Sequence, residues 1–184
     1  MYKKSFIKLV LLLGLSQSLA AWSAIAQESA DQGAYRLGPG DSISIQVFGE
    51  DDLSRQLTLG EDGRINYAFV GQIQLAGQSI EEVEKTITDR LRGDYLINPQ
   101  VSVTMAGYRP FFINGEVNEP GSYPYQPGLT VAKAISLAGG LTERASDKKI
   151  FLIPDGGLES NRLRVSLDDA VEPGVTITIE QSFF

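Results

Sequence analysis

The sequence of 184 residues contains no cysteine and no histidine. The absence of cysteine excludes a disulfide framework, and the absence of both residues excludes zinc fingers, Cys or His nucleophile–base pairs and axial haem histidines. Any catalysis is therefore left to Asp, Glu, Lys, Ser, Thr and Tyr. Basic residues are also few: 16 stand against 23 acidic ones, for a net charge of −7. Because nucleic-acid binding favours a basic face, this balance predicts that nucleic acid is not a partner.

Long apolar runs are rare, and the one that stands out lies near the N-terminus. Three lysines precede the apolar residues 9–15, and an Ala-Ile-Ala sequence that ends at Ala26 has the small-x-small pattern of a signal peptidase site. These features predict a cleaved signal peptide over residues 1–26, with Gln27 as the new N-terminus. The alternative, a transmembrane anchor, would need about 20 apolar residues, and polar residues 16–18 interrupt the run.

Without the signal peptide, the chain has 13 basic and 23 acidic residues, a net charge of −10. No cysteine follows the apolar run, so an acylated lipoprotein N-terminus is not expected. No other segment approaches membrane-spanning length. The sequence therefore predicts an acidic, soluble, exported protein without disulfide bonds, in which a core can form because 42% of all residues are apolar.

After a small, polar leader at residues 27–34, the sequence predicts a first α+β unit over residues 35–107. Apolar residues that alternate with polar ones indicate half-buried strands in this unit. Such strands are predicted at residues 43–47, 57–59, 65–67, 71–75 and 101–105.

A turn and a helix separate these predicted strands. The Asp-Gly pair at residues 62–63 is a hairpin signal. Ser79 and Glu82 form a capping box at the start of a helix over residues 80–91, whose apolar residues recur at helical spacing. Gly93 is expected to end this helix. One amphipathic helix on one face of a small sheet is typical of an α+β unit.

A second unit is predicted over residues 108–184. A strand at residues 111–117 precedes the sequence Glu-Pro-Gly-Ser at 119–122, which fits a type II turn with a positive φ at Gly121. Thr130 is expected to cap a short helix. Strand, turn, strand, helix and further strands follow the order of a β-grasp fold. The further strands are predicted at residues 150–153, 163–167 and 175–179.

Two glycine-rich motifs could be taken for anion-binding sites. The sequence Gly-Pro-Gly-Asp at residues 38–41 could cradle an anion with its backbone N–H groups. Neither a helix N-terminus nor a lysine follows it, so a structural turn is the favoured interpretation. Gly139 and Gly140 follow a predicted helix rather than precede one, which indicates a C-terminal cap.

Acidic and aromatic clusters also leave alternatives open. Residues 50–52 and 168–169 could supply a carboxylate pair for glycoside hydrolysis, but their turn-like contexts favour solvated loops. Calcium is an open alternative at residues 50–52, although a calcium-binding loop pattern is absent; no cofactor or metal is predicted. The aromatic residues at 108–112, with Tyr123 and Tyr125, could stack on sugars, but filling a small core is the favoured interpretation.

The motifs along nearly all of the predicted mature chain resemble those of the bacterial outer-membrane polysaccharide export proteins. Tyr-Arg-Leu-Gly-Pro-Gly-Asp at residues 35–41 is similar to the opening of that family's export domain, and the motifs at residues 62–65 and 98–101 follow in the same order. Residues 115–121 and 138–140 are similar to the family's soluble-ligand-binding β-grasp (SLBB) module. Agreement in order strengthens motifs that are individually weak. The motif residues are Gly38, Pro39, Gly40, Asp41, Gly63, Gly71, Gly115, Pro120, Gly121, Gly139 and Gly140.

The resemblance implies a role in capsule or exopolysaccharide export that is not enzymatic and needs no cofactor. Proteins of this kind form homo-oligomeric rings in the periplasm, associated with the outer membrane. The rings conduct a secreted polysaccharide away from an inner-membrane polysaccharide co-polymerase, and an outer-membrane β-barrel is a further candidate partner. Larger relatives add a second β-grasp module and a C-terminal membrane helix, so this chain resembles a short form. The alternatives are a periplasmic carbohydrate-binding module that forms no conduit and, with least support, a glycan-cleaving enzyme.

Overall fold

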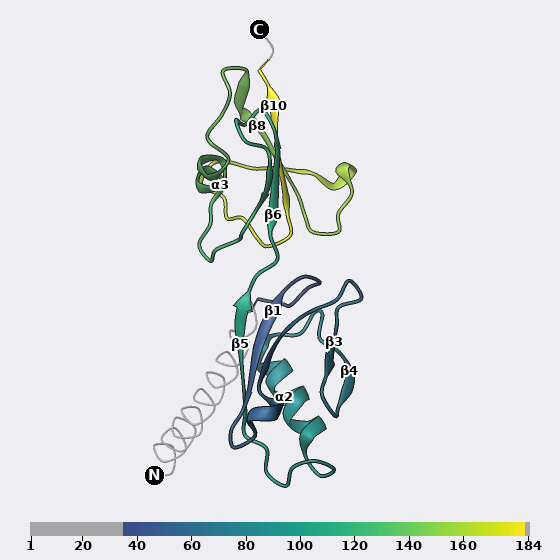
Figure 1. Ribbon diagram of the computed structural model, residues 1–184. Coiled ribbons are helices and arrows are strands. Elements are labelled where there is room, and N and C mark those ends of the chain that lie inside the picture. The colour runs from purple at the N-terminus through teal and green to yellow at the C-terminus, as the bar shows by residue number, and fades with distance from the viewer. Residues whose placement is uncertain (1–34, 183–184) are drawn as a thin grey trace, which may run out of the picture. The chain divides into compact units, whose positions relative to one another are not determined.

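A computed structural model describes residues 35–182 (Figure 1). The predicted signal peptide at 1–26, with Ala26 and Gln27 at its cleavage site, and the predicted leader at 27–34 lie outside the described residues. The described part of the chain contains strands in three sheets and two α-helices, which makes it α+β as predicted. Within residues 35–182, no helix is both long enough and apolar enough to cross a membrane.

The first sheet has three antiparallel strands in the order β2-β1-β5. Its strands are β1 (Ser42–Val47), β2 (Arg55–Thr58) and β5 (Val101–Gly107). The isoleucines and valine of β1 are buried, while the polar residues between them are more exposed. The predicted alternation is therefore confirmed in β1, which forms the middle of the sheet.

Helix α2 (Ile80–Leu91) lies against this sheet (Figure 1). It buries three apolar residues, and the Glu84 carboxylate accepts a hydrogen bond from the N–H of Val103 in β5 at 3.1 Å. The predicted capping box is present. The Ser79 hydroxyl accepts from the N–H of Glu82 at 3.3 Å, and the Ser79 N–H donates to the Glu82 carboxylate at 2.8 Å.

We expect Ser79→Ala to lower the free energy of unfolding by about 1 kcal/mol, because the side chain caps an otherwise unpaired helix N–H group. Chemical denaturation monitored by circular dichroism measures the change. Ser136→Ala is the matched control: its exposed hydroxyl donates only to the Ala132 carbonyl inside a helix, at 2.9 Å, and alanine favours helix there. Equal losses in the two variants would contradict the capping role.

Strands β3 (Arg64–Tyr67) and β4 (Gly71–Gln74) form a separate antiparallel hairpin. The predicted hairpin turn at residues 62–63 is therefore wrong in one respect. Gly63 does occupy a turn with φ +71°, but β2 and β3 on either side of it do not pair. The reason is that the Gly63 carbonyl accepts hydrogen bonds from the N–H groups of Leu75 and Ala76, both at 3.0 Å, which directs the turn toward the end of β4.

The second sheet has five strands in the order β7-β6-β10-β8-β9, with α3 (Val131–Leu137) on one side (Figure 1). The middle strand β10 pairs in parallel with β6 and antiparallel with β8. The strands are β6 (Phe111–Gly115), β7 (Gly121–Tyr123), β8 (Ala145–Ile153), β9 (Leu163–Arg164) and β10 (Thr176–Gln181). The fully buried core includes Phe111, Ile113, Val131, Ala134, Ile150, Ile177 and Ile179.

Three predicted elements of this unit differ from the structure. Strand β8 begins five residues before the predicted 150–153, and β9 covers only two residues of the predicted 163–167. The predicted type II turn is wrong as well, because Gly121 has no positive φ. Gly121 pairs with Ile113 in the ladder of β6 and β7, so its backbone is extended. The positive φ that the chain needs here lies at Gly115, at +85°.

Both caps of α3 follow the prediction. The Thr130 hydroxyl accepts a hydrogen bond from the N–H of Lys133 at 3.4 Å. Gly139 and Gly140 have φ of +75° and +87°, and the Gly140 N–H donates to the Ile135 carbonyl at 2.9 Å. Left-handed glycines in these positions close the helix as a C-terminal cap.

Candidate functional site

The turn at residues 38–41 does not form an open site for an anion. Its main feature is the carboxylate of Asp41. The side chain of Asp41 is completely buried. Its two oxygens accept hydrogen bonds from the N–H of Gly38, from the backbone N–H of Arg109 and from the Arg109 guanidinium, each at 2.8 Å. The guanidinium Nε also lies 3.0 Å from a carboxylate oxygen of Asp155. Asp41 of the motif therefore binds the positively charged side chain of Arg109.

The glycines around Arg109 make room for its side chain. A Cβ atom on Gly38 would overlap the guanidinium, and a Cβ on Gly174 would lie 2.7 Å from its Nε. The backbone N–H groups of the motif are already used, since Gly40 donates to the Leu59 carbonyl at 3.0 Å and Asp41 to the Gly38 carbonyl at 3.1 Å. These contacts favour the structural interpretation of the motif over anion binding.

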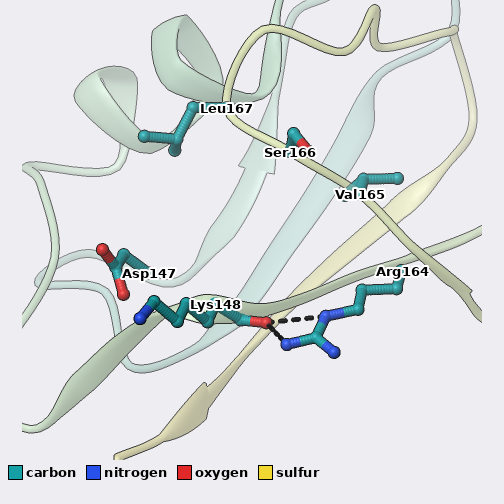
Figure 2. A pocket seen from close by; sticks show the side chains of 6 residues that line it. All are labelled: Asp147, Lys148, Arg164, Val165, Ser166 and Leu167. Carbon is teal, nitrogen blue, oxygen red and sulfur yellow. Dashed lines mark hydrogen bonds between the residues drawn. The ribbon is translucent and has the colours of Figure 1, made fainter.

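An open pocket lies in the second sheet, between β8 and the segment that follows β9 (Figure 2). Its volume is about 480 Å³. Figure 2 shows the Arg164 side chain turned toward β8, where its guanidinium donates two hydrogen bonds to the Lys148 carbonyl, the one from Nε at 2.8 Å. The lining residues are Asp147, Lys148, Arg164, Val165, Ser166 and Leu167. Carboxylate, cations, hydroxyl and apolar surface suit the binding of a polar ligand.

A nearly buried carboxylate ties together the ends of three segments in the second unit. Glu116 accepts hydrogen bonds from the hydroxyl of Thr142 at 2.6 Å, the amide of Gln181 at 2.8 Å and the guanidinium of Arg144 at 3.2 Å. The bond from Thr142 is the largest cause that lowers the pKa of Glu116, followed by the bond from Gln181, and the positive charge of Arg144 adds to both. The ionised form is therefore the one that the native fold favours.

The stability of the protein should fall in acid partly through Glu116. A carboxyl whose native pKa is lowered stabilises the fold above its ordinary pKa, and this contribution is lost as the pH falls through the lowered native pKa. We expect Glu116→Gln to destabilise the protein at neutral pH and to flatten the acid limb of a plot of unfolding midpoint against pH. Glu143→Gln, an exposed neighbour with the same change in charge, is the control. Parallel acid limbs for wild type and Glu116→Gln would contradict this role.

The acidic pairs stay in exposed turns. Asp51 and Asp52 belong to a 3-10 turn, and Asp169 accepts a hydrogen bond from the Ser166 N–H at 2.7 Å. Within the described range, no three acidic side chains gather in a way that could hold a metal ion. Nothing about either pair supports the carboxylate geometry of a glycosidase.

The aromatic residues around 108–125 behave mainly as core. Phe111 is completely buried and stacks on Tyr123 with ring centroids 5.9 Å apart. Tyr108 meets Tyr125 edge to face at 5.3 Å, and Tyr123 and Tyr125 pack against the core of the second sheet. Phe112 is the half-exposed member of the group.

Sequence reasoning missed an exposed aromatic pair. Phe69, in the turn between β3 and β4, is 68% exposed, and its ring lies 6.0 Å from that of Tyr95. The Tyr95 hydroxyl donates to the Phe69 carbonyl at 2.7 Å. Phe69 is the one described residue other than glycine with a positive φ, +64°, a conformation that costs roughly 1–2 kcal/mol. An aromatic residue two positions before Gly71, between two strands with alternating apolar residues, was the available signal.

Comparison with known proteins gives matches within both of the predicted units. Residues 29–106 match the sequence profile of a family described as "Polysaccharide biosynthesis/export protein", and residues 110–160 match that of the SLBB domain. The exopolysaccharide production protein ExoF of Rhizobium meliloti is 36% identical over 145 residues, which cover 72% of this chain and 34% of ExoF. The polysialic acid transport protein KpsD of Escherichia coli is 28% identical over 143 residues, 72% of this chain and 26% of KpsD. The chain thus spans about a third or less of the length of these relatives.

Proposed function

Since this chain belongs to the polysaccharide export protein family, we propose that it is a periplasmic component of a machine that exports a capsular polysaccharide or exopolysaccharide. The observation that carries the proposal is the ordered match of an export domain and an SLBB domain along one chain. The family is one of export and transport proteins rather than of enzymes. The carboxylate pairs in exposed turns agree with a role in binding and conducting a glycan, without cleavage.

We further propose that copies of the protein assemble into a ring. Both larger sheets end on open strands, β2 and β5 in one and β7 and β9 in the other. Open strands offer backbone groups for pairing or must be protected from it. A head-to-tail contact avoids fibres only when it closes with cyclic symmetry. Partners of the ring would be the secreted polysaccharide, an inner-membrane polysaccharide co-polymerase and, as a further candidate, an outer-membrane β-barrel.

A second candidate function is a periplasmic carbohydrate-binding module that forms no conduit. The open pocket of Figure 2 favours it, because its charged and hydroxyl side chains can bind a polar ligand without any assembly. Such a protein would remain monomeric in cells that secrete polysaccharide.

Deleting the gene tests the export role, and cross-linking in secreting cells tests the ring. We expect the deletion to abolish the surface polysaccharide and the wild-type gene to restore it. Cross-linking should give a series of multimers. Normal polysaccharide in the deletion strain would contradict the export role. Monomers alone in actively secreting cells would contradict the ring and favour the binding module.

The periplasmic location depends on the predicted signal peptide. We expect the protein recovered from the periplasm to begin at Gln27, because the signal peptidase pattern ends at Ala26. Mass spectrometry of the N-terminal peptide measures this directly. A protein that still begins at Met1 in the cell envelope would contradict the prediction.

A further inference from the structure

We propose that the turn between β3 and β4 and the turn that carries Tyr95 form an aromatic platform, Phe69 with Tyr95, on which pyranose rings of the exported polysaccharide stack. The inference rests on the proposed export function and adds the place where the chain contacts its cargo.

The conformation of Phe69 has no explanation in packing. A positive φ disfavours a bulky side chain, and glycine would adopt it freely. Burial of the ring could offset the strain, yet 68% of the residue is exposed. The Tyr95 hydroxyl holds the strained residue in place through its carbonyl. Backbone strain that is held at an exposed position points to a function for the side chain it presents.

The hairpin that carries Phe69 also exposes two amide side chains. Asn66 and Gln72 face each other across β3 and β4, and both are exposed, while the neighbouring pair Ile65 and Ile73 is buried. Each amide offers a donor and an acceptor. An aromatic ring and amides exposed on one hairpin suit a sugar, which has C–H groups on its ring faces and hydroxyl groups at its edge.

The charge of the hairpin that carries Phe69 also fits a glycan. Residues 64–78 carry one charged side chain, the cation Arg64, in a chain with 23 acidic residues. The relative KpsD is named for the transport of polysialic acid, a polymer of acidic sugars. A segment without carboxylates would therefore repel such a chain less than the rest of the surface does.

A shallow platform is suited to a chain that has to move. Transport requires contacts that are strong enough to admit the cargo and weak enough to release it. Two aromatic rings at the surface supply a contact of that kind, because the sugar remains largely in water. An enclosed pocket would release each sugar unit too slowly for transport.

A tryptophan reporter tests binding in the purified protein. Trp22, the single tryptophan of the chain, lies in the predicted signal peptide, so Phe69→Trp in the mature protein places one fluorophore on the platform. The probe is the cells' own surface polysaccharide, cleaved to short oligosaccharides by mild acid. We expect a saturable emission shift, and an affinity about tenfold lower after Tyr95→Ala, since aromatic contacts have that magnitude. The control reporter is Phe48→Trp, at a phenylalanine of similar exposure, 65%. No shift at Phe69→Trp, or an equal shift at both positions, would overturn the proposal.

Phe69→Gly separates this role from folding. Glycine accepts the positive φ, so we expect an unchanged or higher Tm together with loss of oligosaccharide binding and reduced surface polysaccharide. A strain with Phe48→Ala, which also removes an exposed ring, should secrete normal amounts of surface polysaccharide. Normal secretion by Phe69→Gly in a strain where the gene deletion abolishes secretion would overturn the platform while leaving the export function intact. A deletion without effect would instead overturn the export function.

Discussion

Gly115→Ala should strongly destabilise the sheet in which β6 pairs with β10. The residue has φ +85°, and a Cβ atom there would collide with the carbonyl oxygen of Ile179 in the adjacent strand β10. The obstacle is backbone in the middle of a sheet, so no side chain can rotate away. Left-handed strain of roughly 1–2 kcal/mol adds to an overpacking cost of about 1–3 kcal/mol. We expect a loss of about 3 kcal/mol or more, which is a large share of the stability of a domain of this size.

Gly121→Ala is the matched control for Gly115→Ala. Gly121 lies in the same sheet, has no positive φ, and its nearest neighbour to an added Cβ is a ring atom of Tyr123 at an ordinary 3.9 Å. Its alanine variant should therefore be close to wild type or slightly more stable. Urea denaturation of both variants, with soluble yield as a second readout, measures the difference. Similar stability of the two variants would show that β6 and β10 can separate at Gly115 without cost.

Asp41→Asn should destabilise the protein by about 3–5 kcal/mol, because it removes the buried one of the two carboxylates that pair with the Arg109 guanidinium. Asp41 is completely buried, and Arg109 is 15% exposed. Asparagine has the same shape but places an NH₂ group among N–H donors, so at least one of three hydrogen bonds is also lost. The expected result is a lower urea midpoint at neutral pH with an unchanged slope.

Asp89→Asn provides the comparison for Asp41→Asn. Asp89 pairs with Arg92 at 3.3 Å on the exposed side of α2, and exposed pairs of this kind contribute about 0.5 kcal/mol or less. The double variant Asp41→Asn with Arg109→Met tests the origin of the loss. It should recover part of the stability, since the guanidinium that has lost its buried partner is removed as well. A double variant that is no more stable than Asp41→Asn would point to the lost hydrogen bonds as the dominant cause.

Local patterns in the sequence predicted the local structure of the chain well. Ser79 and Glu82 form the predicted capping box, and Gly139 and Gly140 cap α3 with positive φ. The burial of Ile43 within β1 follows the predicted alternation. In each case the residues that decide the conformation are close together in the sequence, so the physical cause is visible in a short window.

Contacts between distant residues were beyond sequence reasoning. Asp41 and Arg109 are 68 positions apart, and nothing in either motif indicates the other. For the same reason, the positive φ was predicted at Gly121, whereas the structure has it at Gly115. Proline before Gly121 is a local turn signal, whereas the need for a glycine at 115 comes from the close approach of Ile179. The aromatic pair Phe69 and Tyr95 likewise depends on two turns that only the fold brings together.

The position of β10 sets the order in which the second unit can fold. The first strand of this unit, β6, pairs with the last strand, β10, and β10 lies between β6 and β8. A chain that has been synthesised or translocated only as far as β8 therefore lacks the strand to which both β6 and β8 pair. Closure between such distant segments is slow, because a long loop has to be ordered before the pairing compensates for it. If the protein is exported as proposed, this topology keeps the second unit open until residues 176–181 have crossed the inner membrane. The sheet would then form on the periplasmic side, where the finished domain is needed.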